Sequence, residues 1–253
     1  MKSTVKKISL LLIVSVTLLL SSCLDSGPNS YIGYDEYSYI TRSETGIVFA
    51  RTASGNLITS EKISSLQPGS AVLLSFEVSG DDEVIKIDEV VNIYKVNLGK
   101  EPIVLKQEPL RLSSAPEAAP VYIENIFEPQ TWVTMKSFYF GDRWPFTFQY
   151  NAKKGEEVKF SFYKVPEDEL PTNLNADVLI DIRMVKSGTP EPNANDELKN
   201  ENIVGNMSLL RDISASADSQ EVKELTVKFR YYKADKDGEL YITARPISIT
   251  VQI

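Results

Sequence analysis

Three segments in the second half of the chain alternate apolar and polar side chains with a period of two, and this pattern restricts the fold more than any other. Residues 158–163, 178–184 and 225–232 each place large apolar side chains at every second position. Side chains of a β-strand point alternately to its two faces, so each segment predicts a strand with one face in a core and one in water. We expect such strands to pair into two packed antiparallel sheets, which makes residues 121–253 a β-sandwich domain.

Two polar stretches inside this domain are expected to connect its strands. Residues 186–202 are rich in Pro, Asn, Glu and Gly and predict a long loop. Residues 235–239 read Asp-Lys-Asp-Gly-Glu and are followed directly by the alternating Leu240, Tyr241 and Ile242. Asp-Gly between two strands is typical of a hairpin turn, whereas a calcium loop needs further oxygen ligands and a Glu at its end. The sequence therefore predicts a hairpin here and no metal site or cofactor.

Residues 31–98 predict a second, smaller all-β domain. Short alternating segments are separated by turn sequences at residues 54–56, 67–69 and 80–82. Residues 85–94 are expected to form one last strand, which Glu89 interrupts. About five strands in so short a segment, with no convincing helix, favour a small OB-like barrel. Residues 99–120 contain four prolines and are expected to be the linker between the two domains.

The N-terminus has the layout of an export signal. Lysines at positions 2, 6 and 7 precede an apolar run over residues 8–20, which is too short to span a bilayer permanently. The run ends in Leu-Ser-Ser-Cys, which resembles the lipobox of bacterial lipoproteins. That resemblance implies a signal peptide over residues 1–22, a lipid on Cys23 and a polar tether over residues 23–30. Leu24 follows the cysteine instead of an acid, which resembles lipoproteins sent to the outer membrane; the face of that membrane stays open.

Composition excludes several classes of function. The chain has no histidine, so Ser-His-Asp and Cys-His nucleophile systems are excluded. Its only cysteine is Cys23, which leaves none for a disulfide once it carries a lipid. Removal of residues 1–22, with three lysines and no acid, takes the formal net charge from −8 to −11. Such a charge repels phosphate backbones, and we therefore expect no nucleic-acid partner.

An aromatic cluster beside the Gly141-Asp142 turn supplies the candidate binding residues. Tyr139 and Trp144 have a parity that predicts outward-facing rings, and Arg143 lies between them in sequence. Exposed rings could stack on a sugar or on a side chain of a partner protein. Alternatively, the same residues close one end of the sandwich.

The order of an export signal, a small barrel and a sandwich resembles the NigD-like lipoproteins of Bacteroidetes. The likeness rests on residues 20–23, on residues 85–94 and 126–132, and on the strands at 158–163 and 225–232. It implies an OB-like domain followed by a β-sandwich, a role related to bacteriocin immunity, and no catalytic residues.

Together these features predict a non-enzymatic, lipid-anchored envelope protein that binds a protein or a glycan. Two alternatives remain. A structural subunit of a fimbrial or pilus-like assembly would also be a lipoprotein built of β domains. A hydrolase that works through carboxylates would need two acids across a cleft, whereas pairs such as Asp81-Asp82 lie in turn-like sequence.

Overall fold

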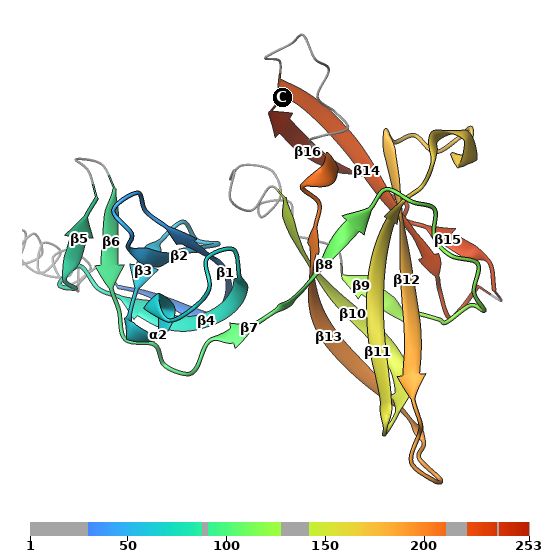
Figure 1. Cartoon of the computed structure of the whole chain (residues 1–253), viewed down its shortest axis with the longest axis horizontal. Helices are drawn as coiled ribbons and strands as arrows, with labels where there is room; N and C mark the ends of the chain where they lie inside the picture. Colours follow the sequence, from blue (N-terminus) through green and yellow to red (C-terminus); the bar gives the residue numbers. More distant parts are fainter. Residues whose placement is uncertain (1–29, 88–90, 128–141, 211–221, 237, 253) are drawn as a thin grey trace, which may run out of the picture.

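The computed structural model describes residues 30–87, 91–127, 142–210, 222–236 and 238–252. Almost every regular element in these ranges is a β-strand, and the strands form two sheets. Figure 1 shows a smaller N-terminal body beside a larger C-terminal one, so the predicted all-β class and domain order are confirmed. Cys23, the export signal and the tether up to residue 29 lie outside the described residues. No helix within the described ranges has the length and hydropathy needed to cross a membrane.

The first sheet curls into the predicted barrel. Its strands are β1 (Tyr31–Arg42), β2 (Val48–Thr52), β3 (Leu57–Thr59), β4 (Ala71–Val78), β5 (Val84–Lys86), β6 (Asn92–Lys95) and β7 (Ile103–Val104). They hydrogen-bond in the order β5-β6-β3-β2-β1-β4-β7. Beyond the end of β6, Leu98 bridges to Phe76 of β4, and the Gly99 N–H donates to the Ser75 carbonyl at 2.8 Å. These contacts join β6 to β4 and close the ring of strands, as in a partly open OB-like barrel.

A short helix covers part of the barrel core. Helix α2 (Glu61–Ser64) lies between β3 and β4, and the Ser60 hydroxyl caps it by accepting from the Ile63 N–H at 3.2 Å. Ile63 is fully buried and packs with Ile40, Ile58 and Leu74. The helix therefore fills the barrel with one apolar side chain while its charged residues stay in solvent.

The predicted single strand over residues 85–94 is instead a hairpin. Strands β5 and β6 pair antiparallel, with Ile85 opposite Ile93, and Glu89 falls among the undescribed residues 88–90. Opposite residues in a hairpin point to the same face of the sheet, so the apolar parity continues through the turn. For this reason the alternation gave no sign that the chain reverses.

The second sheet folds over into a sandwich. Its strands are β8 (Lys106–Arg111), β9 (Asn125–Phe127), β10 (Arg143–Lys153), β11 (Glu156–Lys164), β12 (Val178–Gly188), β13 (Asp196–Asn206), β14 (Val222–Tyr232), β15 (Leu240–Ile242) and β16 (Ile247–Gln252). β9, β10 and β13 form one layer, and β11, β12, β14, β15 and β16 form the other. β8 pairs with β13 through residues 106–109 and with β11 through residues 110–111, and it thus joins the two layers.

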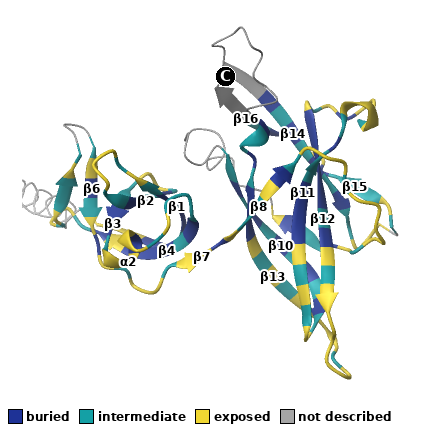
Figure 2. Cartoon of the chain, in the orientation of Figure 1, coloured by how far each residue is buried: buried dark blue, intermediate teal, exposed yellow. Residues whose placement is uncertain are grey.

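One large core lies between these layers. Buried and half-buried residues alternate along the whole of β10, a pattern visible in Figure 2. The Phe148 ring stacks on Phe160 of β11 with centroids 4.0 Å apart, and Phe146 meets Phe162 at 5.1 Å. The strands predicted at 158–163, 178–184 and 225–232 all send their apolar faces into this core.

The pairing inside the sandwich is not wholly antiparallel as predicted. β8 runs parallel to both β11 and β13, and β12 runs parallel to β14. Side-chain alternation reports which face of a strand is buried and carries no information on the direction of its neighbour. The direction depends on which strands become neighbours in space, and the sequence pattern does not show which strands those are.

The predicted linker over residues 99–120 is partly strand. β7 pairs with β4 of the barrel, and β8 follows after the single residue Leu105 and enters the sandwich. Its Pro109 is the last residue of β8 paired with β13. Irregular chain remains at residues 99–102 and 112–122, after which Ile123 bridges to Lys233 just beyond β14.

The loop predicted over residues 186–202 is also mostly strand. β12 extends to Gly188, β13 begins at Asp196, and only residues 189–195 connect them. The hairpin expected at residues 235–239 joins β14 to β15, which pair antiparallel. Residue 237 lies outside the described residues, and Gly238 has a φ of +89°, a conformation that glycine adopts without strain.

Candidate functional site

Of the predicted binding cluster, the structure describes Arg143 and Trp144, and the Trp144 ring does not face solvent. Trp144 is fully buried, and its ring meets Phe229 edge-on with centroids 6.1 Å apart. The expectation of an outward ring was wrong, because Trp144 shares the inward parity of Phe146 and Phe148 once β10 begins at Arg143. Tyr139 lies outside the described residues.

Arg143 contacts the barrel domain. Its backbone carbonyl accepts a hydrogen bond from the Tyr37 hydroxyl at 3.3 Å. Its guanidinium donates from Nη1 to Oδ1 of Asn206 at 2.7 Å and lies over the Tyr39 ring, 5.9 Å from the centroid. We call Tyr37, Tyr39, Arg143 and Asn206 the domain clamp. The residue predicted to bind a ligand therefore connects the two domains.

A small apolar cluster supports the domain clamp. Tyr37 and Ala71 of the barrel pack with Leu105 and with Val204 of β13, and all four are buried. The Gln107 side-chain amide donates to the Gly69 carbonyl at 2.9 Å. Burial raises the pKa of the Tyr37 hydroxyl well above its ordinary value. Tyr37 is therefore a neutral hydrogen-bond donor at physiological pH.

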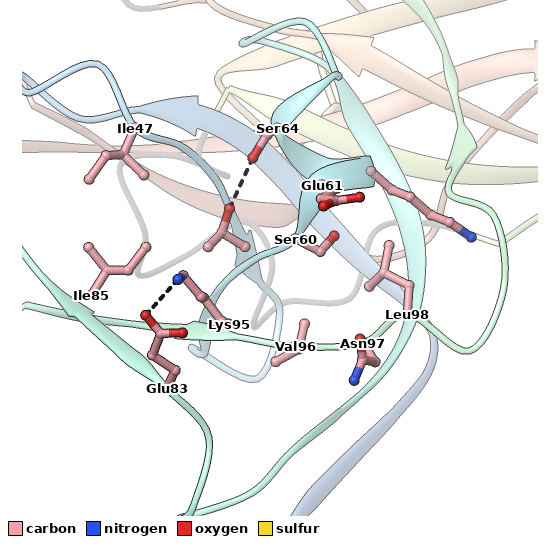
Figure 3. Close-up of a pocket in the computed structure, with 12 residues that line it drawn as sticks. Ile47, Ser60, Glu61, Ser64, Glu83, Ile85, Lys95, Val96, Asn97 and Leu98 are labelled. Atoms are coloured by element: carbon pink, nitrogen blue, oxygen red, sulfur yellow. Dashed lines mark hydrogen bonds and ion pairs between the residues drawn. The ribbon is translucent and has the colours of Figure 1, made fainter.

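The barrel carries an open pocket of about 1010 Å³. Figure 3 shows it between the end of β3, helix α2 and the stretch that follows β6. Its apolar lining is aliphatic and comes from Ile47, Ile85, Val96 and Leu98. Its polar lining comes from Thr59, Ser60, Ser64, Asn97, Glu61, Lys62, Glu83 and Lys95.

Charges of both signs line this barrel pocket. Lys95 Nζ donates to Glu83 Oε1 at 2.6 Å, and both side chains are largely exposed. Lys62 pairs with Glu101 just outside. Such exposed pairs contribute about 0–1 kcal/mol to stability and can exchange partners readily. Hydroxyl groups also line the pocket, among them those of Ser64 and Thr59, which lie 3.4 Å apart.

The chemistry of the barrel pocket suits a peptide. Aliphatic side chains beside hydroxyl, amide and charged groups can contact an apolar side chain and hydrogen-bond a backbone at the same time. The residues that line it include no aromatic ring, the group that most favours stacking on a sugar. No group of three or more metal-ligating side chains comes together in the described part of the chain.

Sequence reasoning did not select the barrel pocket. Its residues are spread over positions 47 to 98, and none of them belongs to a motif. They come from separate strands and connections of the barrel and meet only in the folded chain.

Comparisons with known proteins define the fold. No family model matches the chain, and no curated protein sequence matches it. An uncharacterised protein from Parabacteroides merdae is similar in structure, with a TM-score of 0.56 and 10% identity, covering 86% of this chain and 99% of that one. At this identity the similarity shows a common fold alone.

Two further solved structures, with lower TM-scores, come from Bacteroides species. A NigD-like immunity protein from Bacteroides caccae matches with a TM-score of 0.48 and 12% identity over 85% of this chain and 96% of its own. A putative lipoprotein from Bacteroides fragilis matches with a TM-score of 0.48 and 11% identity over 89% and 99%.

Proposed function

We propose that this protein is a non-enzymatic lipoprotein of the cell envelope that binds a segment of another protein in its barrel pocket. The lipid on Cys23 would hold it in the outer membrane. The observation that carries the proposal is the pocket itself, because aliphatic, hydroxyl, amide and charged side chains meet there in one open hollow.

The position of the barrel supports a role close to the membrane. β1 begins at Tyr31, so only residues 24–30 separate the barrel from the anchored cysteine. A random-coil segment of seven residues spans on the order of 15 Å. The barrel pocket would therefore lie near the membrane surface, with the sandwich held beyond it by the domain clamp.

Two acidic residues that a carboxylate hydrolase could use, Asp82 and Glu156, accept hydrogen bonds from the backbone. Asp82 accepts a hydrogen bond from the Ser79 N–H at 2.7 Å, and Glu156 accepts from the Lys153 N–H at 2.7 Å. The hydrogen bond from Lys153, and with it the charge of Lys186, lowers the pKa of Glu156 below its ordinary value. A general acid requires a raised pKa, so Glu156 does not suit that role.

In-cell photocrosslinking tests the proposal. A photoreactive amino acid at Asn97, an exposed residue of the barrel pocket, should capture one protein in the native cells. The same amino acid at Lys154, an exposed residue at the β10–β11 turn, serves as the matched control and should not capture it. Mass spectrometry identifies the adduct, and the purified pair should then bind in solution.

The other outcomes either identify the partner or contradict a defined part of the proposal. Adducts of the protein with itself would indicate a structural subunit of a polymer. A captured bacteriocin would identify the binding as immunity. Adducts at Lys154 but none at Asn97 would exclude the barrel pocket, and glycan adducts would replace the protein partner by a sugar.

A further inference from the structure

A row of charged and aromatic side chains crosses the outward face of the second sandwich layer. Arg111 of β8 lies opposite Tyr163 of β11, Tyr163 lies opposite Asp181 of β12, and Asp181 lies opposite Arg230 of β14. These residues alternate with the apolar residues of the sandwich core. Their side chains therefore point away from that core.

Two arginines form ion pairs with one buried carboxylate, that of Asp181, at the centre of this row. Asp181 is only 1% exposed, and its Oδ2 accepts from Nη2 of Arg183 at 2.7 Å and from Nη2 of Arg230 at 2.8 Å. Each arginine side chain is 17% exposed. One carboxylate between two guanidinium groups leaves one net positive charge, although the whole chain has a formal net charge of −8.

Tyrosine rings hold the guanidinium planes in place. The Arg183 guanidinium lies 4.7 Å from the centroid of Tyr232, and the Arg111 guanidinium lies 5.3 Å from that of Tyr163. Stacking of this kind fixes the orientation of the guanidinium group and so lowers the cost of ordering it on binding. We call Arg111, Tyr163, Asp181, Arg183, Arg230 and Tyr232 the arginine ladder.

Unpartnered polar atoms gather in the arginine ladder. Arg111 Nη1, Asp181 Oδ1, Arg183 Nε and Arg230 Nε are buried atoms without a hydrogen-bond partner among the described residues. Buried polar atoms are nearly always hydrogen-bonded, so a concentration of exceptions needs an explanation. The arginine nitrogens among these atoms are hydrogen-bond donors that the residues of the ladder leave unused.

We propose that the arginine ladder binds carboxylate side chains of an acidic segment of a partner protein. Guanidinium groups recognise carboxylates through paired, charge-assisted hydrogen bonds. Arginine and tyrosine are also the residues that contribute most to protein–protein binding. Val185, two residues beyond Arg183 on the same face, is 51% exposed and supplies apolar contact beside the charge. This surface is on the sandwich, and the proposal is independent of the barrel pocket.

Charge changes at Val185 test the ladder without disturbing the fold. A short fluorescein-labelled polyglutamate peptide is titrated with the purified full chain, and its anisotropy is measured. Val185→Glu should weaken binding at least about tenfold, and Val185→Lys should strengthen it, because the new charge repels or attracts the carboxylates next to Arg183. Equal affinity of both variants would overturn the proposal.

A second comparison removes the ladder itself. The triple variant D181L/R183M/R230M replaces the whole ion cluster by apolar side chains, a change that is often neutral for stability. It should lose polyglutamate binding, whereas Lys154→Ala, which changes the net charge equally at the β10–β11 turn, should retain it. Retention by the triple variant would contradict the proposal, as would binding of polygalacturonate in preference to polyglutamate. Neither result bears on capture at Asn97.

Discussion

Trp144 is the residue with the largest gap between its predicted and its observed role. It was expected to face outward, and it lies fully buried in the sandwich core against Phe229. We expect Trp144→Ala to lower the free energy of unfolding by about 3–5 kcal/mol, because the cavity cannot close in so crowded a core. Urea denaturation followed by circular dichroism measures the change. A loss below about 1 kcal/mol would mean that the ring contributes little to packing.

Ionisation of Tyr150 is predicted to lower the free energy of unfolding at alkaline pH. Its hydroxyl donates to Glu201 Oε2 at 3.1 Å, and burial, followed by the charge of Glu201, raises the pKa of Tyr150 to about 12. In the unfolded chain a tyrosine ionises near pH 10, so the folded state holds this proton more tightly. The free energy of unfolding should therefore fall as the pH rises from about 10 to about 12.

Urea denaturation across that range tests the prediction for Tyr150. Tyr150→Phe should make the decline less steep, whereas Tyr34→Phe should leave it unchanged, because Tyr34 is 80% exposed. Part of the decline should remain in Tyr150→Phe, since burial also raises the pKa of Tyr37. An identical pH dependence in the parent chain and in Tyr150→Phe would contradict the assignment.

At the scale of elements, two hairpins meet where the β10–β11 turn touches the β12–β13 connection. Gly155 has a φ of +91°, and a Cβ on it would lie 2.5 Å from the Thr189 carbonyl oxygen. We expect Gly155→Ala to destabilise the protein by about 1–3 kcal/mol through backbone strain and this contact. Thermal unfolding measures the effect. Gly46→Ala is the control, because Gly46 shares the positive φ but a Cβ there meets nothing within 4 Å.

Strands with one buried face were predictable from the sequence. Strands with both faces exposed to solvent were not. The apolar parity around Phe160, Ile180 and Val227 located β11, β12 and β14. The first half of β13 is mostly exposed on both faces and is held by pairing with residues 149–153 of β10. A polar strand stabilised by its partner has the composition of a loop. This is why residues 186–202 were assigned as one.

The candidate sites were less predictable than the fold. Arg143 was selected from its aromatic neighbours in sequence, but the ring that it contacts is Tyr39 in the other domain. The alternation over residues 178–184 and 225–232 puts Arg183 and Arg230 on the outward faces of their strands. Arg183 lies two residues from Asp181 on the same strand, but the parallel pairing of β12 with β14, which brings Arg230 to Asp181, does not follow from alternation. Sites built across domains or sheets depend on contacts distant in the chain.

At the scale of the whole molecule, the domain clamp is expected to fix the angle between barrel and sandwich. Arg143→Ala removes the hydrogen bond to Asn206 and the contact with Tyr39, while the backbone bond to Tyr37 remains. Spin labels at Ser54 and Ser187, one in each domain, should give one narrow distance distribution in the parent chain and a broader one in the variant. Lys154→Ala should leave the distribution narrow, and equal widths in all three chains would show that the clamp does not restrict the domains.

The consecutive strands β7 and β8 determine how a pulling force passes from one domain to the other. Residues 103–111 are hydrogen-bonded to β4 at one end and to β13 and β11 at the other, with only Leu105 between. If a lipid on Cys23 holds the barrel and a partner bound at the arginine ladder pulls on the sandwich, as proposed above, the tension runs along this segment. Its hydrogen bonds then carry the load together in shear and do not open one after another. Under such a load the segment resists separation of the barrel from the sandwich.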